Sequence, residues 1–571
     1  MGLNNFTYSD YTNTIAKKYL VPQRLIAEHD TDNPQFLLKD IHRQAALNTL
    51  ECCVIRKGGY VVLDFGSELQ GGIDLTVAAI IHEGQTSEAK PADKYGHIRI
   101  VFGESVTEAM SSIGGESNAL NDHSTRDMTV ETCGMSTMRY GNTGFRFVKI
   151  EAIDKPIYVG GVKGVLEYKD IEYKGSFRCN DERLNTIFDT AAYTVHLNMQ
   201  DYIWDGIKRD RLVWIGDMHP EMSTICSVFG YDECVERSLD FTRDCYPITD
   251  EIEKNNPNKI WMVFPSYTCW WIKIHRDWYY QNGNLDYLME QKDYMYKACN
   301  KLAEKVHEDG TLHFCNDTDQ YFTDWSSNQT PYMEAGFRGC FILAMEAAAE
   351  IFDIYGDGDM SKKCSTTAQN LKKIVPQYEG NKQTCAMTSL SGLCDAQEIN
   401  EIISKDLLKG LSTFYGYYVL HALAKAGNTQ GAIDAMRNYW GAMLDLGATT
   451  FWEDFDIDWI ENAARIDEIV PEGKTDVHAA YGKFCYQKLR HSLCHGWASG
   501  PAPFMTQHIL GVKVAEPGCA KLIIEPHLGD LEWAKGTYPT PHGIVEIEHK
   551  LVDGKIETKV NAPERVKIEV R

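Results

Sequence analysis

Two regions of the chain alternate apolar and polar residues with the period of two that is typical of β-strands. The first region predicts strands at residues 60–64, 73–80, 97–102, 145–153 and 164–168, separated by turns rich in Gly and Asn. The second begins near residue 508 and predicts strands at 511–514, 520–525, 543–548, 555–560 and 566–570, with a hairpin turn at Asp553 and Gly554. Many short alternating strands favour a β-sandwich at each end of the chain.

Between these regions the apolar residues recur with the period of a helix. Asp181 is placed to cap a helix whose apolar residues Leu184, Ile187, Phe188 and Ala191 share one face. Further helices are predicted at 229–243, 268–282, 286–306, 333–355, 361–376, 405–426, 429–444 and 475–492. We therefore expect a β-sandwich domain at 1–174, a helical domain at 175–508 and a second β-sandwich domain at 509–571. The helical pattern fits a toroid of helix pairs or an α-solenoid, although no fixed-period repeat is visible.

Charge and cysteine content narrow the class of protein. The 571 residues carry a net charge of -24, which argues against binding to nucleic acid or to an anionic membrane surface. No apolar stretch approaches the roughly 20 residues of a membrane helix, and residues 1–20 lack the apolar run of a signal peptide. The 17 Cys residues follow no zinc-ribbon or redox spacing and suit a reducing compartment. We expect a cytoplasmic protein with no metal or cofactor, and a homodimer is left open.

Residues 205–221, DGIKRDRLVWIGDMHPE, combine carboxylates, three cations, a Trp and two Gly. Asp205, Asp210 and Asp217 stand among apolar residues, where carboxylates need partners. One Lys and two Arg of the same segment are close enough in sequence to supply them. This composition is that of a functional site or of a salt-bridged loop between helices.

The same segment resembles the signature D-C-P-x-R-E-R-L-G-W-T-G-D of the α-L-rhamnosidases of glycoside hydrolase family 78. The matching residues are Asp205, Arg209, Asp210, Arg211, Leu212, Trp214, Gly216 and Asp217. By this resemblance Asp210 takes the place of the general acid, which in the family is most often Glu. Asp205, Arg209 and Asp217 are implied to hold sugar hydroxyls, with Trp214 beside them.

A second segment, GATTFWEDFD at residues 447–456, resembles the family's G-x-T-T-x-W-E segment, whose Glu is the general base. The resemblance gives Glu453 that role and places Trp452 at the substrate. Spacing alone does not separate Glu453 from the nearby acids Asp454, Asp456 and Asp458, which are equally compatible with helix caps or solvated side chains.

Two further segments carry residues that suit a sugar site. In SLCHGWASGP, residues 492–501, the resemblance implies that His495 hydrogen-bonds a sugar hydroxyl and that Trp497 lines the pocket. Taken alone, His495 is more typical of a structural residue, and no second His lies at metal-ligand spacing. In YFTDW, residues 321–325, Asp324 and Trp325 suit the polar rim and apolar face of a pyranose, or else a buried Trp beside a helix cap.

The resemblance implies a central (α/α)6 barrel flanked by N-terminal and C-terminal β-sandwich domains. It also implies release of terminal α-L-rhamnose from small rhamnosides by inverting acid/base catalysis, without a cofactor. An inverting pair requires carboxyl groups about 6.5 to 9.5 Å apart, so that water fits between Glu453 and the sugar. Two alternatives stay open: a non-catalytic sugar-binding protein of the same fold, and another (α/α)6 enzyme such as a glycoside phosphorylase.

Overall fold

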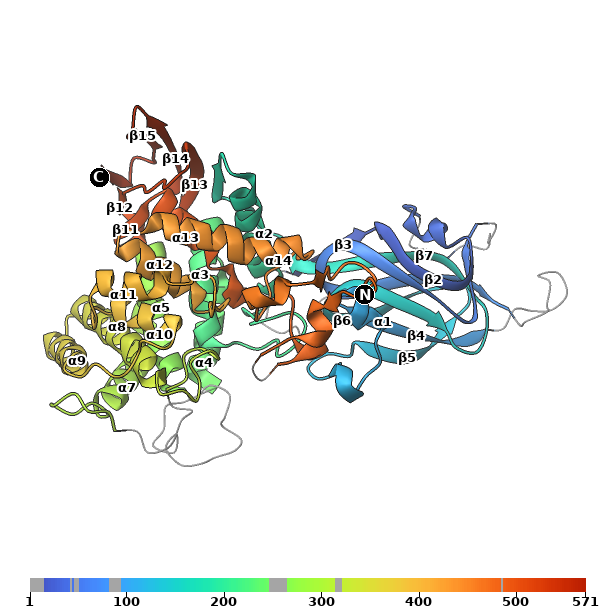
Figure 1. The fold of residues 1–571 in the computed structure, drawn as a ribbon, viewed down its shortest axis with the longest axis horizontal. Coiled ribbons are helices and arrows are strands. Elements are labelled where there is room, and N and C mark those ends of the chain that lie inside the picture. The colour runs from blue at the N-terminus through green and yellow to red at the C-terminus, as the bar shows by residue number, and fades with distance from the viewer. Residues whose placement is uncertain are drawn as a thin grey trace, which may run out of the picture.

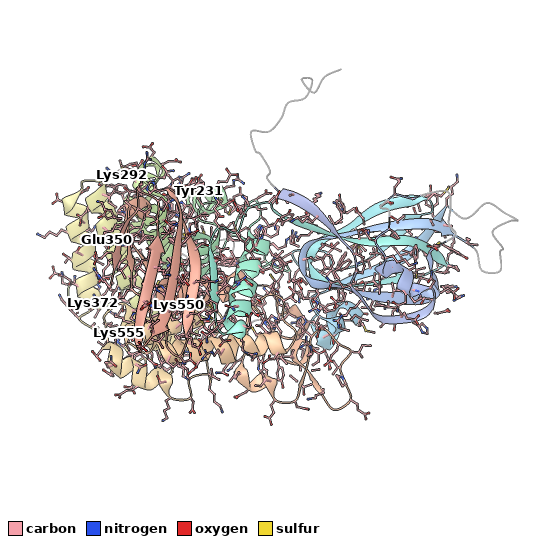
Figure 2. The ribbon with its side chains drawn as sticks, turned by 90° about the horizontal axis from the view of Figure 1, so that it is seen from above. Tyr231, Lys292, Glu350, Lys372, Lys550 and Lys555 are labelled. Carbon is pink, nitrogen blue, oxygen red and sulfur yellow. The ribbon has the colours of Figure 1, made fainter. Side chains whose placement is uncertain are left out.

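The protein is described from a computed structural model, over residues 15–41, 44–45, 51–81, 94–245, 264–313, 321–483 and 486–571. An N-terminal β domain lies at one end of the molecule, beside a helical domain that carries the C-terminal strands (Figure 1). Seen from above, the C-terminal sheet with Lys550 and Lys555 lies over the helices, well away from the N-terminal β domain (Figure 2).

The N-terminal β domain is a single antiparallel sheet that folds over on itself. Its order is β1-β7-β3-β6-β4-β5, with β2 paired to β3. The two predicted strands at 60–64 and 73–80 belong to one long strand, β3, in which Ile55 and Ile80 both lie opposite Ile157 of β7. Because both ends of β3 meet β7, the sheet encloses one core. The strands are β1 (Ile15–Leu20), β2 (Arg24–Asp32), β3 (Cys53–Ile80), β4 (Tyr95–Gly103), β5 (Asp127–Cys133), β6 (Ser136–Ala152) and β7 (Ile157–Lys169), with the short helix α1 (Val106–Met110) after β4.

The helical domain is an (α/α)6 barrel in which outer and inner helices alternate along the chain. The inner helices contact one another in the order α3, α5, α8, α10, α12 and α16, and α16 returns to α3. They are α3 (Ile215–Val228), α5 (Pro265–Asn282), α8 (Met333–Ile354), α10 (Lys382–Leu390), α12 (Gly416–Lys425) and α16 (Pro501–Phe504), the last continued by a π-helical turn. The outer helices are α2 (Glu182–Asn198), α4 (Glu233–Cys245), α6 (Leu285–Glu290), α7 (Lys292–Ala303), α9 (Gly358–Leu371), α11 (Ala396–Ser404), α13 (Thr429–Ala435) and α14 (Gly441–Asp445).

Several helix predictions are confirmed and others are wrong. Asp181 caps α2 as expected, accepting hydrogen bonds from the backbone of Arg183 and Leu184. The helix predicted at 475–492 is wrong. The chain there forms β10 (Thr475–Asp476), paired with β9 (Ala463–Ala464), then the four-residue helix α15 (Val477–Ala480) and a loop. The left-handed backbone at Gly482 and Lys488 explains why no helix continues through that loop. Similarly, the helix predicted to begin at 405 begins only at Gly416, after a left-handed turn at Gly410.

The C-terminal strands form two sheets, as a β-sandwich requires. One contains β11 (Val512–Glu516), β12 (Lys521–Ile524) and β16 (Lys567–Val570), and the other has the order β15 (Lys555–Asn561), β14 (Gly543–Val552), β13 (Trp533–Thr540) and β8 (Ser176–Cys179). Asp553 and Gly554 form the predicted hairpin turn with positive φ at both residues. Because β8 precedes α2, the second sheet ties the start of the helical domain to the end of the chain.

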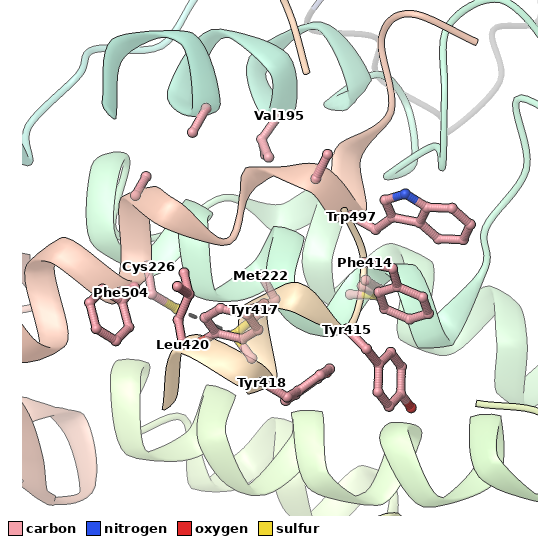
Figure 3. Packing of buried hydrophobic residues seen from close by; sticks show 14 of the residues in the cluster. Val195, Met222, Cys226, Phe414, Tyr415, Tyr417, Tyr418, Leu420, Trp497 and Phe504 are labelled. Atoms are coloured by element: carbon pink, nitrogen blue, oxygen red, sulfur yellow. Dashed lines mark hydrogen bonds between the residues drawn. The ribbon is translucent and has the colours of Figure 1, made fainter. Parts of the chain in front are cut away.

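Aromatic side chains of α12 and of the loops before α12 and α16 pack in the buried core of the barrel. Phe414 and Trp497 stack with ring centres 4.7 Å apart and planes 6° from parallel (Figure 3). Tyr417 and Tyr418 continue this packing along α12, and all four side chains are buried. Loops that rest on this core are held by large rigid side chains.

None of the helices in the described part of the chain combines the length and apolar character needed to span a bilayer.

An ion network centred on the buried Asp64 joins the N-terminal β domain to the barrel. Asp64 accepts hydrogen bonds from Arg24 and Arg146, and the same two guanidinium groups contact Asp467 of the barrel. Arg146 also donates to the carbonyl of Gly447 at 3.0 Å. The segment that leads to Glu453 is therefore anchored on the β domain.

Candidate active site

The predicted site residues lie on loops that lead from an outer to an inner helix. Residues 199–214 precede α3, residues 321–332 precede α8, residues 405–415 precede α12, and residues 446–500 precede α16. In a barrel of alternating helices these loops emerge at the same end, so residues far apart in sequence meet there. The carboxylates, the His and the aromatic residues of the four segments are thereby brought together.

Arg209 connects the two proposed catalytic carboxylates. Its Nη2 donates a short hydrogen bond to Oε2 of Glu453, and its Nη1 lies 3.4 Å from Oδ1 of Asp210. Its Nε donates to the carbonyl of Arg490 at 2.8 Å, and the guanidinium carbon lies 3.3 Å from the centre of the Tyr486 ring. The Asp210 and Glu453 side chains are only 5% and 3% exposed. Two carboxylates from distant segments thus flank one fixed, buried cation.

The loop after α14 and the segment around residue 492 hold Glu453 in place. Its Oε2 accepts a hydrogen bond from the backbone N–H of Ser492 at 3.2 Å, and its own N–H donates to the Ser492 carbonyl at 3.0 Å. Its carbonyl accepts from Nε1 of Trp497 at 2.9 Å and from the Thr413 hydroxyl. The second and third sequence motifs are therefore hydrogen-bonded to each other, which fixes the direction of the Glu453 side chain.

The three neighbouring acids have other partners. Asp456 caps the short helical turn Ile457–Ile460 and pairs with Lys483, and Asp458 is exposed. Asp454 is half-buried, and its N–H donates to Nε2 of His491. Burial, together with the negative charge of Glu453, raises the pKa of Asp454 to about 7. Only Glu453 of this group contacts Arg209.

Asp210 sits in a strained turn. Asp210 and Arg211 both have positive φ, 46° and 54°, a conformation that costs a residue with a side chain about 1 kcal/mol or more. Contacts with the N-terminal β domain hold the turn, since Arg211 donates two hydrogen bonds of 2.8 Å to Asn142. The Tyr486 hydroxyl lies 3.4 Å from Oδ2 of Asp210, and His123 of the β domain approaches Oδ1 to 3.6 Å.

Asp205 and Asp217 bring further negative charge to the site. Asp217 lies in the first turn of α3, with Oδ1 3.2 Å from Nε2 of His495 and Oδ2 3.4 Å from the Tyr267 hydroxyl. Burial raises the pKa of Asp217 and lowers that of His495. Asp205 accepts from the Leu212 N–H at 3.0 Å. Burial and the charges of Asp210 and Asp217 raise the pKa of Asp205 well above its usual range.

Two of the four predicted site tryptophans are partly accessible, and the other two are buried in the core. Trp214 and Trp325 are half-buried, whereas Trp452 and Trp497 are 1% and 5% exposed. Trp325 stands edge-on to the Tyr486 ring, with ring centres 6.3 Å apart, and the same ring carries the Arg209 guanidinium. Trp452 lies edge-on against Phe455 in the core, and Trp497 stacks on Phe414.

Asp324 is tied to its own loop and to the loop before α12. It is buried, its Oδ2 accepts from the Ser412 hydroxyl, and its Oδ1 is 3.4 Å from the Ser326 N–H. Burial raises its pKa.

Sequence reasoning missed residues that become relevant only through tertiary contact. Tyr486 and Ser492 touch Arg209, Asp210 and Glu453, although no spacing in the sequence pairs them with those residues. His123 comes from the β domain, to which no chemistry was assigned. The sequence did carry a local pattern at another β-domain segment near the site. Ser105 and Glu108 form the S-x-x-E pattern of a helix N-cap, and the Ser105 side chain accepts a hydrogen bond from the Glu108 N–H.

Among the described residues, Glu104, Glu108 and His478 approach one another closely enough to surround a metal ion. The Lys208 ammonium lies among them, 2.9 Å from Glu108, 3.4 Å from Glu104 and 3.5 Å from Nε2 of His478. A lysine therefore supplies the positive charge that this group of buried side chains needs.

Glu221, one turn after Asp217 on α3, gives a prediction for stability. Its side chain is 1% exposed, its Oε1 finds no hydrogen-bond partner in the described part of the chain, and burial raises its pKa well above the usual range. The unfolded chain ionises Glu221 above its ordinary pKa and the folded chain does not, so folding takes up a proton. This contribution destabilises the fold as pH rises, by up to about 1.4 kcal/mol per pH unit.

We therefore expect Glu221→Gln to raise the midpoint of thermal unfolding at pH 8 and to have a much smaller effect at pH 5. Unfolding followed by circular dichroism at both pH values measures the difference. Glu472→Gln, at an exposed loop residue, is the control and should change neither midpoint. An equal shift at pH 5 and pH 8 for Glu221→Gln would show that Glu221 is ionised in the folded protein.

Two regions of the chain match models of bacterial alpha-L-rhamnosidase domains. Residues 172–389 match the bacterial alpha-L-rhamnosidase 6 hairpin glycosidase domain, and residues 511–571 match the bacterial alpha-L-rhamnosidase C-terminal domain. The resemblance to the α-L-rhamnosidases is confirmed. The first match contains Asp205, Arg209, Asp210 and Asp217, whereas Glu453 and His495 lie between the two matched ranges.

Two similar proteins are named alpha-L-rhamnosidase. An alpha-L-rhamnosidase of Alteromonas sp. (strain LOR) is 23% identical over 479 residues, which is 75% of this chain and 48% of that protein. One of Formosa agariphila is 22% identical over 479 residues, covering 75% of this chain and 47% of that protein. The chain therefore spans about half the length of each of these two relatives.

Solved rhamnosidase structures share the fold. The family 78 rhamnosidase of Bacillus sp. GL1 has a TM-score of 0.72 at 21% identity, covering 94% of this chain and 55% of that one. A Klebsiella oxytoca rhamnosidase with rhamnose bound has a TM-score of 0.68 at 17% identity, covering 87% of this chain and 96% of that one. The predicted architecture, an (α/α)6 barrel between two β domains, is therefore confirmed.

Proposed function

We propose that this protein hydrolyses terminal α-L-rhamnosides, with Asp210 as general acid and Glu453 as general base. The observation that carries the proposal is that Arg209 contacts both carboxylates, although they are 243 positions apart in sequence. Two buried carboxylates held by the two terminal nitrogens of one fixed guanidinium suit a reaction that needs one acid and one base. We take the sugar to be α-L-rhamnose because the similar proteins are named alpha-L-rhamnosidases.

In the proposed reaction Asp210 donates its proton to the glycosidic oxygen as the bond from that oxygen to the anomeric carbon breaks. Glu453 accepts a proton from a water molecule that attacks the anomeric carbon from the opposite face. The product sugar then has inverted configuration, and the leaving group departs as an alcohol. Arg209 holds Glu453 by a charge-assisted hydrogen bond and keeps the two carboxylates at a fixed separation.

The remaining residues are assigned to sugar binding. Asp217 and His495, already hydrogen-bonded to each other, and Asp205 are the proposed partners of the ring hydroxyls. The half-buried face of Trp325, beside Tyr486, suits the C–H face and the methyl group of a deoxy sugar.

We also propose a cytoplasmic location and small rhamnosides as substrates. The 15 cysteines in the described part of the chain are all free thiols, which supports a reducing compartment. A polymer would not reach an enzyme there. The strongly negative chain remains a poor candidate for nucleic-acid or membrane binding.

The proposal is tested by release of nitrophenol from p-nitrophenyl α-L-rhamnopyranoside, with nitrophenyl glycosides of other sugars alongside. We expect turnover of the rhamnoside, little turnover of the others, and no increase on addition of phosphate. A phosphate requirement would indicate a phosphorylase. Binding of rhamnose without turnover of any glycoside would indicate a sugar-binding protein of the same fold.

A further inference from the structure

The N-terminal β domain contributes a buried carboxylate that reaches the segment holding Glu453. Glu104 follows β4 and its side chain is fully buried. Its Oε2 accepts a hydrogen bond of 2.7 Å from the backbone N–H of Leu493, and its Oε1 lies 3.4 Å from the Ser492 hydroxyl. Ser492 in turn donates its backbone N–H to Oε2 of Glu453. A single residue therefore lies between the carboxylate of the β domain and the proposed catalytic base.

The position of Glu104 is itself fixed from several sides. Lys208, which precedes Arg209, lies 3.4 Å from Oε2 of Glu104 and 2.9 Å from Oε1 of Glu108. The same ammonium donates to the carbonyls of Leu489 and His491 at 2.6 and 2.8 Å. Glu108 accepts from the Glu104 N–H at 2.8 Å and pairs with Arg126 at 3.2 Å. These buried contacts leave Glu104 a single well-defined conformation.

The geometry points to Glu104 as a positioning residue for Glu453: its carboxylate fixes the Ser492–Leu493 backbone, and that backbone fixes the base. This inference rests on the proposed function. It assigns the N-terminal β domain a part in catalysis although none of its residues needs to touch the reacting atoms. A displacement of about 1 Å at a catalytic group lowers rates by as much as 10²-fold, so loss of this contact should appear in kcat.

Two substitutions at Glu104 separate position from charge. Glu104→Gln keeps an oxygen within reach of the Leu493 N–H but loses the charge that pairs with Lys208. Glu104→Asp keeps the charge but withdraws the carboxylate by about 1.5 Å, one C–C bond length. Positioning predicts that kcat stays within about threefold for Gln and falls about tenfold for Asp, with KM little changed in both. A role in charge balance alone predicts the opposite order.

Glu108→Asp is the matched comparison, because Glu108 pairs with the same lysine but makes no hydrogen bond to Ser492 or Leu493 within the described part of the chain. Because Glu108 contacts Glu104 only through the Glu104 backbone N–H, Glu108→Asp should lower the temperature of unfolding and reduce kcat less than Glu104→Asp does. The comparison of Glu104→Asp with Glu108→Asp remains informative even if the Gln variant does not fold.

Hydrogen–deuterium exchange of the Leu493 and Ser492 amides tests the inference without activity. Exchange should become faster in Glu104→Asp than in Glu104→Gln or Glu108→Asp. If the unmodified protein turns over no glycoside but exchange follows this order, the proposed function fails and the positioning contact stands. If exchange at these amides is unchanged in Glu104→Asp, or if kcat falls more for Gln than for Asp, the inference is overturned.

Discussion

Glu453→Gln is expected to lower kcat for p-nitrophenyl α-L-rhamnopyranoside by about 10³-fold while leaving KM within a fewfold. The amide cannot accept a proton from the attacking water, but it keeps the shape of the side chain and an oxygen for the Ser492 N–H. Steady-state kinetics of the purified variant measure the effect. Because Arg209 loses its charged partner, a modest loss of thermal stability is expected as well.

The control for this substitution is Asp458→Asn, which changes an exposed acid of the same segment and should leave kcat unaltered. Asp454→Asn tests the alternative base, because Asp454 is half-buried next to Glu453 in the sequence and its pKa is raised to about 7. If Glu453→Gln kept more than about a tenth of the activity while Asp454→Asn lost it, the base would be Asp454.

Asp210→Asn is expected to have an effect that depends on the leaving group. Removal of a general acid should lower kcat about 10³-fold to 10⁴-fold for an alkyl rhamnoside, whose leaving alcohol needs a proton. The loss should be far smaller for the p-nitrophenyl rhamnoside, since nitrophenolate leaves readily as an anion. Kinetics of the variant with both substrates measure the ratio.

Glu453→Gln provides the internal control, because activation of water is needed whatever group departs. Its loss of rate should be similar for the alkyl and the nitrophenyl rhamnoside. An Asp210→Asn variant with the same loss on both substrates would assign Asp210 to sugar binding or structure, and the acid would then lie elsewhere.

The sequence predicted those parts of the molecule that depend on local pattern. The cap at Asp181 and the hairpin at Asp553 and Gly554 follow from residue type and spacing and form as expected, and the predicted strands all lie in β-structure, although 60–64 and 73–80 join in one strand. The helix predicted at 475–492 shows the limit of such patterns. Its residues are held by contacts with other segments, such as Asn118 with the carbonyl of Gln487 and Ser105 with His478, and these contacts override the local periodicity.

The site was predictable to the extent that its residues stand in recognisable segments. The segments that resemble the family contain Asp210, Arg209 and Glu453, and the sequence offered the nearby carboxylates and the sugar hydroxyls as partners of Arg209, but not Glu453. The bridge from Arg209 to both carboxylates depends on how the loops before α3 and α16 meet, and no spacing encodes that distance. The same holds for Glu104, whose partner Leu493 is 389 positions away.

The most direct test of the acid/base assignment is the configuration of the sugar at the moment of release. Proton NMR of p-nitrophenyl α-L-rhamnopyranoside during rapid hydrolysis resolves the two anomers of rhamnose before they equilibrate. With Asp210 protonating the leaving oxygen and Glu453 activating water on the opposite face, β-L-rhamnose should appear first and the α anomer only later, by mutarotation. Appearance of α-L-rhamnose as the first product would contradict the account, because it requires a covalent intermediate that this pair of roles does not form.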